Sequence, residues 1–242
     1  MQSRFVPLDL QHWPRREIFH YFTKVTAPVS YTATMRLDVS PMREALRRGG
    51  IRFFPSCLYL VTKAIADQPE LRLALQEGTL GIWDYLCPQY PVFHPEDTTF
   101  TFLWTDYDED FGIFYRRVLS DQREYGQDHG IFSKKGMPPE NSYLHASIPW
   151  LAFDAFSFHL SENGEYFAPI VETGKLVRES GREWLPVSLT VNHATADGWH
   201  VSRFFEQLQE DICHPNRWLC ETTGQRNTDH DTFSTGNFKR LC

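Results

Sequence analysis

The chain has 242 residues, of which 15% are aromatic, and carries a formal charge of −7 with histidine counted as neutral. Its 41% hydrophobic and 23% charged residues exclude general disorder, and its length allows one large domain or two small ones. We expect no nucleic-acid partner, because an acidic surface repels phosphate backbones. We also expect a soluble cytoplasmic protein without a membrane partner, since no apolar run could span a bilayer and the N-terminus lacks a signal-peptide pattern.

The cysteines predict neither a disulfide framework nor a zinc knuckle. Their number is odd, and no two of them form a Cys-x-x-Cys pair. They are Cys57, Cys87, Cys213, Cys220 and Cys242. Reduced thiols agree with a cytoplasmic location, and Cys57 is interpreted as a small core residue.

Two helices are predicted in the first third of the chain. Ser40 is placed as the N-cap of the first helix, with a proline in its first turn and Gly49-Gly50 just after its end. Pro55 opens the second helix, which carries apolar side chains on one face and ends near Pro69.

Alternating apolar and polar residues predict strands at 31–39, within 148–159, at 167–171 and, most clearly, at 185–192. Apolar residues at helical spacing from Val201 to Ile212 follow the last strand. This mixture predicts an α/β fold, a two-layer sandwich of a mixed β-sheet covered by α-helices. With no repeat and no linker, residues 1–214 are predicted to form a single domain, and the polar residues 215–242 a loosely ordered tail.

The segment from Asn192 to His200, between this strand and the following helix, holds the candidate chemistry, and three interpretations compete. Asp197 could simply cap the helix and leave His193 as an ordinary loop residue. A metal site formed by His193, Asp197 and His200 is disfavoured, because a strand, loop and helix do not present them on one face and no second cluster completes it. Alternatively, His193 acts as a general base, since an unperturbed pKa of about 6.5 leaves a neutral imidazole available.

Short matches to one family, in a fixed order, surround this junction. They lie at residues 13–19, 54–55, 69–72, 83–84, 92–94, 148–150, 153–156 and 167–170, together with the His-x-x-x-Asp-Gly of residues 193–198. On these motifs, which are colinear over residues 5–212, the chain resembles the chloramphenicol acetyltransferase family of CoA-dependent acyltransferases.

The resemblance implies an enzyme, an antibiotic-resistance acyltransferase that forms a homotrimer with its active sites between subunits. His193 would take the proton of a chloramphenicol hydroxyl while the hydroxyl oxygen attacks the thioester of acetyl-CoA, a cosubstrate rather than a permanently bound cofactor. No metal is expected. Two alternatives remain: the same chemistry on another hydroxyl or amine acceptor, and a weakly active or non-catalytic trimeric protein that binds the drug or CoA.

The resemblance also assigns supporting residues. Asp197 would pair with Arg15 to hold the loop that carries His193, rather than act as the acid of a catalytic triad. Five aromatic residues align with acceptor-binding positions, namely Phe22, Tyr31, Phe100, Phe132 and Phe158. Each of these rings taken alone is better explained as core than as pocket, so only the shared alignment favours a pocket.

Four positions depart from the family pattern close to the expected chemistry. Ala146 stands where the family has an oxyanion-stabilising serine, and the next residue, Ser147, would point to the other face of a regular strand unless a bulge turned it. Glu172 replaces a threonine, where a carboxylate could repel the oxyanion or bind a cationic acceptor. Thr190 replaces a glutamine, and Asn192 replaces the first of two histidines. These changes predict a shifted acceptor or reduced activity, with Ser147 as a possible replacement donor.

Overall fold

The computed structural model describes residues 3–158 and 166–219. Its main sheet has the strand order β2-β10-β8-β7-β5-β6, with β9 paired to the first residues of β10. Strand β7 runs parallel to both of its neighbours and the other pairs are antiparallel, so the sheet is mixed. The bounds are β2 Ser30–Asp38, β5 Cys87–His94, β6 Thr99–Trp104, β7 Ser142–Ser147, β8 Ile170–Thr173, β9 Val177–Glu179 and β10 Arg182–Asn192.

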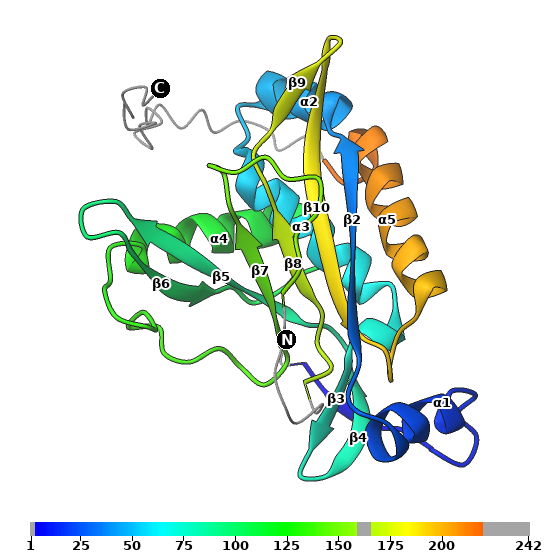
Figure 1. Ribbon diagram of the computed structural model, residues 1–242. Coiled ribbons are helices and arrows are strands. Elements are labelled where there is room, and N and C mark those ends of the chain that lie inside the picture. Colours follow the sequence, from blue (N-terminus) through cyan, green and yellow to red (C-terminus); the bar gives the residue numbers. More distant parts are fainter. Residues whose placement is uncertain (1–2, 159–165, 220–242) are drawn as a thin grey trace.

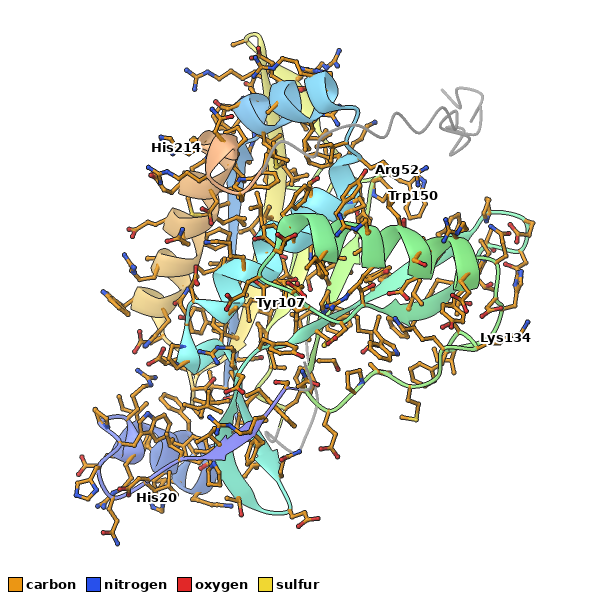
Figure 2. All side chains as sticks on the ribbon, turned by 180° about the vertical axis from the view of Figure 1, so that it is seen from behind. His20, Arg52, Tyr107, Lys134, Trp150 and His214 are labelled. Atoms are coloured by element: carbon orange, nitrogen blue, oxygen red, sulfur yellow. The ribbon has the colours of Figure 1, made fainter. Side chains whose placement is uncertain are left out.

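Helices cover one face of this sheet. Figure 1 shows the sheet in front of the helices, and Figure 2, seen from behind, shows the helices in front of the sheet. The four long helices are α2 Ser40–Gly49, α3 Phe53–Ala66, α4 Phe111–Tyr125 and α5 Gly198–Cys213. The predicted two-layer α/β architecture is therefore confirmed. Among the described residues, no helix is both long and apolar enough to cross a membrane.

The N-terminal part forms a smaller unit at the lower end of the view in Figure 1. It contains a second sheet of order β1-β4-β3, the short helix α1 Arg16–His20 and a π-helical turn Tyr21–Val25 that continues it. The strands are β1 Phe5–Pro7, β3 Leu73–Gln76 and β4 Thr79–Trp83, and a 3₁₀ turn at Pro69–Leu71 follows α3.

Strand β10 and helix α5 fulfil the clearest sequence predictions. The odd-numbered residues Leu185, Val187, Leu189 and Val191 are all buried, as alternation requires. The apolar side of α5, from Val201 to Ile212, is buried in the same core cluster. Burying both apolar faces against each other fixes where the turn between them emerges. Helix α2 begins at Ser40 itself, with Val39 as its N-cap, one residue earlier than predicted.

Two regions of the sheet differ from the sequence expectations. No strand lies in residues 148–158, and His159 is outside the described residues. The strand ends at Ser147 because Ile148 makes the last bond, to the carbonyl of Thr173, and Pro149 has no amide hydrogen to continue the ladder. Strands β5 and β6 were not predicted. The two prolines of β5 are unfavourable in an internal strand, yet β5 pairs with both β6 and β7.

The packed part of the chain extends beyond the boundary predicted at residue 215. A 3₁₀ turn at Pro215–Arg217 leads to Trp218, which is buried against the rings of Tyr59 and Phe111. The indole nitrogen of Trp218 donates to the carbonyl of Asp211 in α5. Trp218 therefore belongs to the core, while residues 220–242 of the predicted tail lie outside the described residues.

Candidate active site

The turn between β10 and α5 has a fixed backbone. The amide of His193 donates to the carbonyl of Val29, and the amides of Thr195 and Ala196 both donate to the carbonyl of Asn192. The side-chain oxygen of Asn192 also accepts from the amide of the next-but-one residue in the turn. The imidazole of His193 therefore projects from a turn whose position is set by the end of the strand.

The ring of His193 contacts two aromatic residues that the resemblance assigns to the acceptor pocket. Its centroid is 4.4 Å from that of Phe22 and 5.3 Å from that of Tyr31. Its Nδ1 lies 3.2 Å from the carbonyl oxygen of Ala196. Because a carbonyl can only accept, the neutral ring carries its hydrogen on Nδ1, and this leaves the lone pair on Nε2. The site thus offers a proton acceptor beside two apolar surfaces.

Asp197 fills two of the predicted roles at once. Its carboxylate accepts from the amide of Trp199 as the N-cap of α5, and it accepts from Nη1 of Arg15 at 2.6 Å. The ring of His200 lies against the same carboxylate, with Nδ1 2.9 Å from Oδ1. Partial burial opposes ionisation, but the Arg15 hydrogen bond and the charges of His200 and Arg15 outweigh it and lower the pKa of Asp197 to about 2. Asp197 therefore caps α5 and pairs with Arg15 at the same time.

The aromatic residues predicted for the acceptor pocket fall into two groups. Phe22 and Tyr31 contact His193, whereas Phe100 and Phe132 both contact the ring of Phe102. The second group is centred on β6, which is one edge of the main sheet, and Tyr31 is on β2, the other edge. Five strand-to-strand steps of about 4.8 Å separate these edges by roughly 24 Å. One chain alone does not bring both groups around one small acceptor.

Phe158, the remaining aromatic candidate, is the last described residue before the gap at 159–165 and is 39% exposed. It is therefore available at the surface of the single chain.

Ala146 and Glu172 are direct neighbours in the sheet. The register between β7 and β8 is unbroken, with Ala146 opposite Glu172 and Ser147 opposite Thr173. No bulge interrupts this pairing, so alternation places Ser147 on the face of Tyr143, which bonds to Thr62 of α3, and Ala146 on the other face. The bulge considered from the sequence as a way to bring Ser147 beside Ala146 is thus absent.

Glu172 is fully buried, and only one of its carboxyl oxygens has a partner among the described residues. Ser188, opposite it on β10, donates its hydroxyl to Oε2, whereas Oε1 has no hydrogen bond there. Burial raises the pKa of Glu172 to about 7, although the Ser188 hydrogen bond works in the opposite direction.

Thr190, another departure from the family pattern, has its hydroxyl 2.6 Å from that of Thr32. We call Ala146, Glu172 and Ser188 the central strip.

The central strip is distant from the histidine of the same chain. His193 comes five residues after Ser188 along the chain. At about 3.3 Å per residue, these two backbone positions are roughly 16 Å apart. Within one chain, His193 and the central strip are therefore too far apart to line the same small site.

Sequence reasoning missed Ser188 and His200 as partners in these networks. Ser188 occupies an even position of β10, so a polar position facing away from the core was visible, but the sequence does not reveal which strand lies beside it. His200 was considered only as a metal ligand with His193 and Asp197. Among the residues described, these three do not form a metal-type cluster.

A profile of the family described as "CAT: Chloramphenicol acetyltransferase" matches residues 3–209. The chain belongs to the chloramphenicol acetyltransferase family. It is 37% identical over 209 residues to a chloramphenicol acetyltransferase of Campylobacter coli, covering 86% of this chain and 98% of that protein. It is 34% identical over 210 residues to chloramphenicol acetyltransferase 3 of Escherichia coli, covering 87% and 97%.

Solved structures extend the similarity in fold. A chloramphenicol acetyltransferase superposes with a TM-score of 0.79 at 22% identity, covering 86% of this chain and 100% of that one. A dihydrolipoamide acetyltransferase of Azotobacter vinelandii superposes with a TM-score of 0.57 at 15% identity, covering 80% and 85%. The chloramphenicol acetyltransferase fold, with its mixed sheet covered by helices, is therefore the fold of this chain.

Proposed function

We propose that this chain transfers the acetyl group of acetyl-CoA to a hydroxyl of chloramphenicol, with His193 as the general base. The observation that carries this proposal is the contact between Nδ1 of His193 and the carbonyl of Ala196, which directs the free lone pair to Nε2. The aromatic rings of Phe22 and Tyr31 beside that nitrogen suit an apolar, ring-containing acceptor. Membership of the family supports the same substrate pair.

The proposed reaction is a direct transfer. Nε2 of His193 takes the hydroxyl proton as the acceptor oxygen bonds to the thioester carbonyl carbon, giving a tetrahedral oxyanion. When this intermediate collapses, the carbon–sulfur bond breaks and the imidazolium returns the proton to the CoA thiolate. An acyl-enzyme on Cys57 or Cys87 is disfavoured, because burial raises the pKa of both thiols to about 12 and keeps them neutral.

A second copy of the chain completes the proposed site. The His193 group and the Phe100 group lie towards opposite edges of one sheet, and the central strip lies roughly 16 Å along β10 from the histidine. The proposed homotrimer brings His193 of one subunit against the Phe100 group of its neighbour and next to Ala146, the one member of the central strip that is not fully buried in the single chain. This arrangement holds both reactants at high effective concentration.

Glu172 acts in this proposal as a neutral acid. Burial raises the pKa of Glu172 to about 7, so that about half of these carboxyl groups are protonated at neutral pH. The protonated form does not repel an oxyanion and leaves an O–H group next to Ala146, where a serine hydroxyl is missing. A cationic acceptor would instead require the ionised carboxylate. The structure favours the neutral acceptor for this reason.

Release of the CoA thiol from acetyl-CoA, with and without chloramphenicol, tests the proposal. We expect drug-dependent turnover that falls about 10²–10⁴-fold in His193→Ala, since this is the usual contribution of a general base. Acetyl-CoA binding should persist in that variant, and His12→Ala, which changes an exposed histidine, serves as the control. Equal product formation by the wild type and His193→Ala would support the non-catalytic binding protein. An acceptor at least tenfold better than chloramphenicol would replace the proposed substrate.

A further inference from the structure

A second group of chemically capable side chains lies far from His193, at the end of the β5–β6 hairpin. His94 is the last residue of β5, Glu96 is in the following turn, and His129 is in the loop after α4. One ligand-type atom from each of these three residues lies within 4.8 Å of the other two. In Figure 1 the hairpin end is at the left, beside the end of α4, whereas the β10–α5 junction is at the lower right.

We propose that His94, Glu96 and His129 form a binding site for a divalent transition metal of the Zn²⁺ type. Two imidazole nitrogens and one carboxylate oxygen are a donor set that suits Zn²⁺, whereas Mg²⁺ and Ca²⁺ prefer oxygen ligands alone. This site is separate from the acetyl-transfer chemistry, so its occupancy does not depend on the proposed function.

The hydrogen bonds of His94 direct its lone pair towards Glu96. Its Nε2 lies 3.0 Å from the hydroxyl oxygen of Thr101, and that hydroxyl donates its single hydrogen to the carbonyl of Asp128. The Thr101 oxygen can therefore only accept from His94, which places the ring hydrogen on Nε2. The unprotonated Nδ1 then faces Oε1 of Glu96 at 3.9 Å. Two acceptors that face each other leave room for a cation between them.

His129 has the complementary arrangement. Its Nδ1 lies 3.2 Å from Oδ2 of Asp97, and its Nε2 lies 3.4 Å from Oε1 of Glu96. Asp97 is held in place by the backbone amide and the hydroxyl of Thr99, which both donate to Oδ1. A carboxylate that accepts from the outer nitrogen of a histidine is the usual support of a metal-binding imidazole, because it fixes the ring tautomer. Both histidines therefore have an oxygen partner on the nitrogen that would not bind the metal.

The distances suit a tetrahedral ion with small adjustments. Ligands about 2.1 Å from a tetrahedral Zn²⁺ are about 3.4 Å apart, close to the 3.4 and 3.9 Å measured from Glu96 to the two histidines. The two rings are stacked, with centroids 4.3 Å apart and 25° between their planes. The ring of His129 must therefore turn to aim Nε2 at the ion, and its side chain, 49% exposed, is free to do so, whereas His94 is buried. Three protein ligands leave a fourth position for water or an external ligand.

The ion would link two segments that carry predicted acceptor contacts. His94 precedes the turn that leads to Phe100, and His129 precedes Phe132, which forms a bridge with Phe102 of β6. Metal binding would thus stabilise this edge of the sheet. Any effect on acceptor binding rests on the proposed function, whereas binding of the ion does not.

Isothermal titration calorimetry of the purified full-length protein with Zn²⁺ alone tests the site. We expect one site that is lost or weakened at least tenfold in His129→Ala and in Glu96→Gln, both of which change exposed side chains. His214→Ala is the matched control, because His214 also lies beside a carboxylate, that of Glu210 at 3.3 Å, but has no second histidine in the cluster. Zn²⁺ should also raise the Tm of the wild type and of His214→Ala, but not that of His129→Ala.

Substitution with Co²⁺ adds a readout that reports the ligands directly. The visible absorption of the bound ion should show nitrogen and oxygen ligation in a four- or five-coordinate site, and it should disappear in His129→Ala. Zn²⁺ binding of equal strength in the wild type, His129→Ala and Glu96→Gln would overturn the proposal. So would the absence of binding in the wild type at millimolar Zn²⁺. Loss of acetyl transfer in His193→Ala with Zn²⁺ binding retained would separate the two sites.

Discussion

The β10–α5 junction and the central strip differ in how their carboxylates are bonded. At the junction, both carboxylate oxygens of Asp197 are bonded, one to Arg15 and the other to the first turn of α5. In the strip, Oε1 of Glu172 has no partner within the described part of the chain; on the opposite, helix-facing side of β7, neither ring nitrogen of His145 has one. Because an unpaired buried oxygen is destabilising, the carboxylate of the junction is held by the chain itself, whereas the carboxylate of the strip keeps one oxygen available for a further hydrogen bond.

Restoring a hydroxyl to the strip should have the largest effect. Ala146→Ser places a donor opposite Glu172, and we expect kcat for acetyl transfer to rise by up to about 10²-fold, the lower end of the usual contribution of one oxyanion donor. Steady-state kinetics with chloramphenicol measures it. Ser147→Ala is the control and should change kcat little, since regular alternation places Ser147 on the other face. A large loss in Ser147→Ala would reverse this assignment of the two positions.

Removing the ionisable group of Glu172 should stabilise the fold in a pH-dependent way. Its pKa of about 7 in the folded state exceeds its ordinary value of 4.5, so the folded state binds the proton more tightly and loses stability as pH rises from 4.5 to 7. The free energy of unfolding of Glu172→Gln, relative to that of the wild type, should therefore rise by up to about 3 kcal/mol when the pH is raised from 4 to 8. Urea unfolding at both pH values measures the difference.

Glu206→Gln, which changes an exposed carboxylate on α5, is the control for Glu172→Gln and should show almost no difference between the two pH values. A stability gain in Glu172→Gln that is equal at pH 4 and pH 8 would contradict the protonated state assigned to Glu172.

Two substitutions of Asp197 separate its cap from its ion pair. Asp197→Ala loses both and should destabilise the protein by about 2 kcal/mol, whereas Asp197→Asn keeps a capping oxygen and should lose about 1 kcal/mol, because the pair is partly exposed. The pKa is lowered in the folded state, so this contribution is fully present above pH 3.8 and disappears as pH falls through about 2. Thermal unfolding at neutral pH measures both variants. Equal losses would show that the ion pair alone matters.

His145 should give the smallest effect, with the opposite pH dependence to Glu172. Burial lowers its pKa to about 3, so the folded state excludes the proton and loses stability as pH falls below the ordinary value of 6.5. The free energy of unfolding of His145→Val, relative to that of the wild type, should therefore rise by about 1 kcal/mol when the pH is lowered from 8 to 5.5. Denaturant melts at the two pH values check the change. A constant difference between the two proteins would indicate that His145 is not buried in its neutral form.

The sequence predicted those parts of the molecule whose structure depends on local pattern. Alternation defined β10, helical spacing defined α5, and the turn between them placed His193 and Asp197. The pairing with Arg15 came from the resemblance, since 182 residues separate the two side chains and no local pattern links them. Strand β5 was missed because its prolines are unfavourable in an internal strand, and tertiary pairing overrides that preference.

The environment of Glu172 could not be predicted either. Its burial and its contact with Ser188 depend on the order of β7, β8 and β10 in the sheet, which is a property of the whole fold. Likewise, nothing in the polar composition around Trp218 indicated that this side chain would enter the core. Patterns of spacing report which face of an element is buried, but not which element covers it.

The separation of His193 from the central strip along β10 has a genetic consequence. If each catalytic centre draws its base from one polypeptide and its opposite wall from another, two differently damaged alleles can compensate for each other. A cell that makes both His193→Ala chains and chains disabled in the strip would assemble mixed oligomers in which some interfaces unite the two intact halves. Co-expression should then recover part of the activity that neither allele has alone.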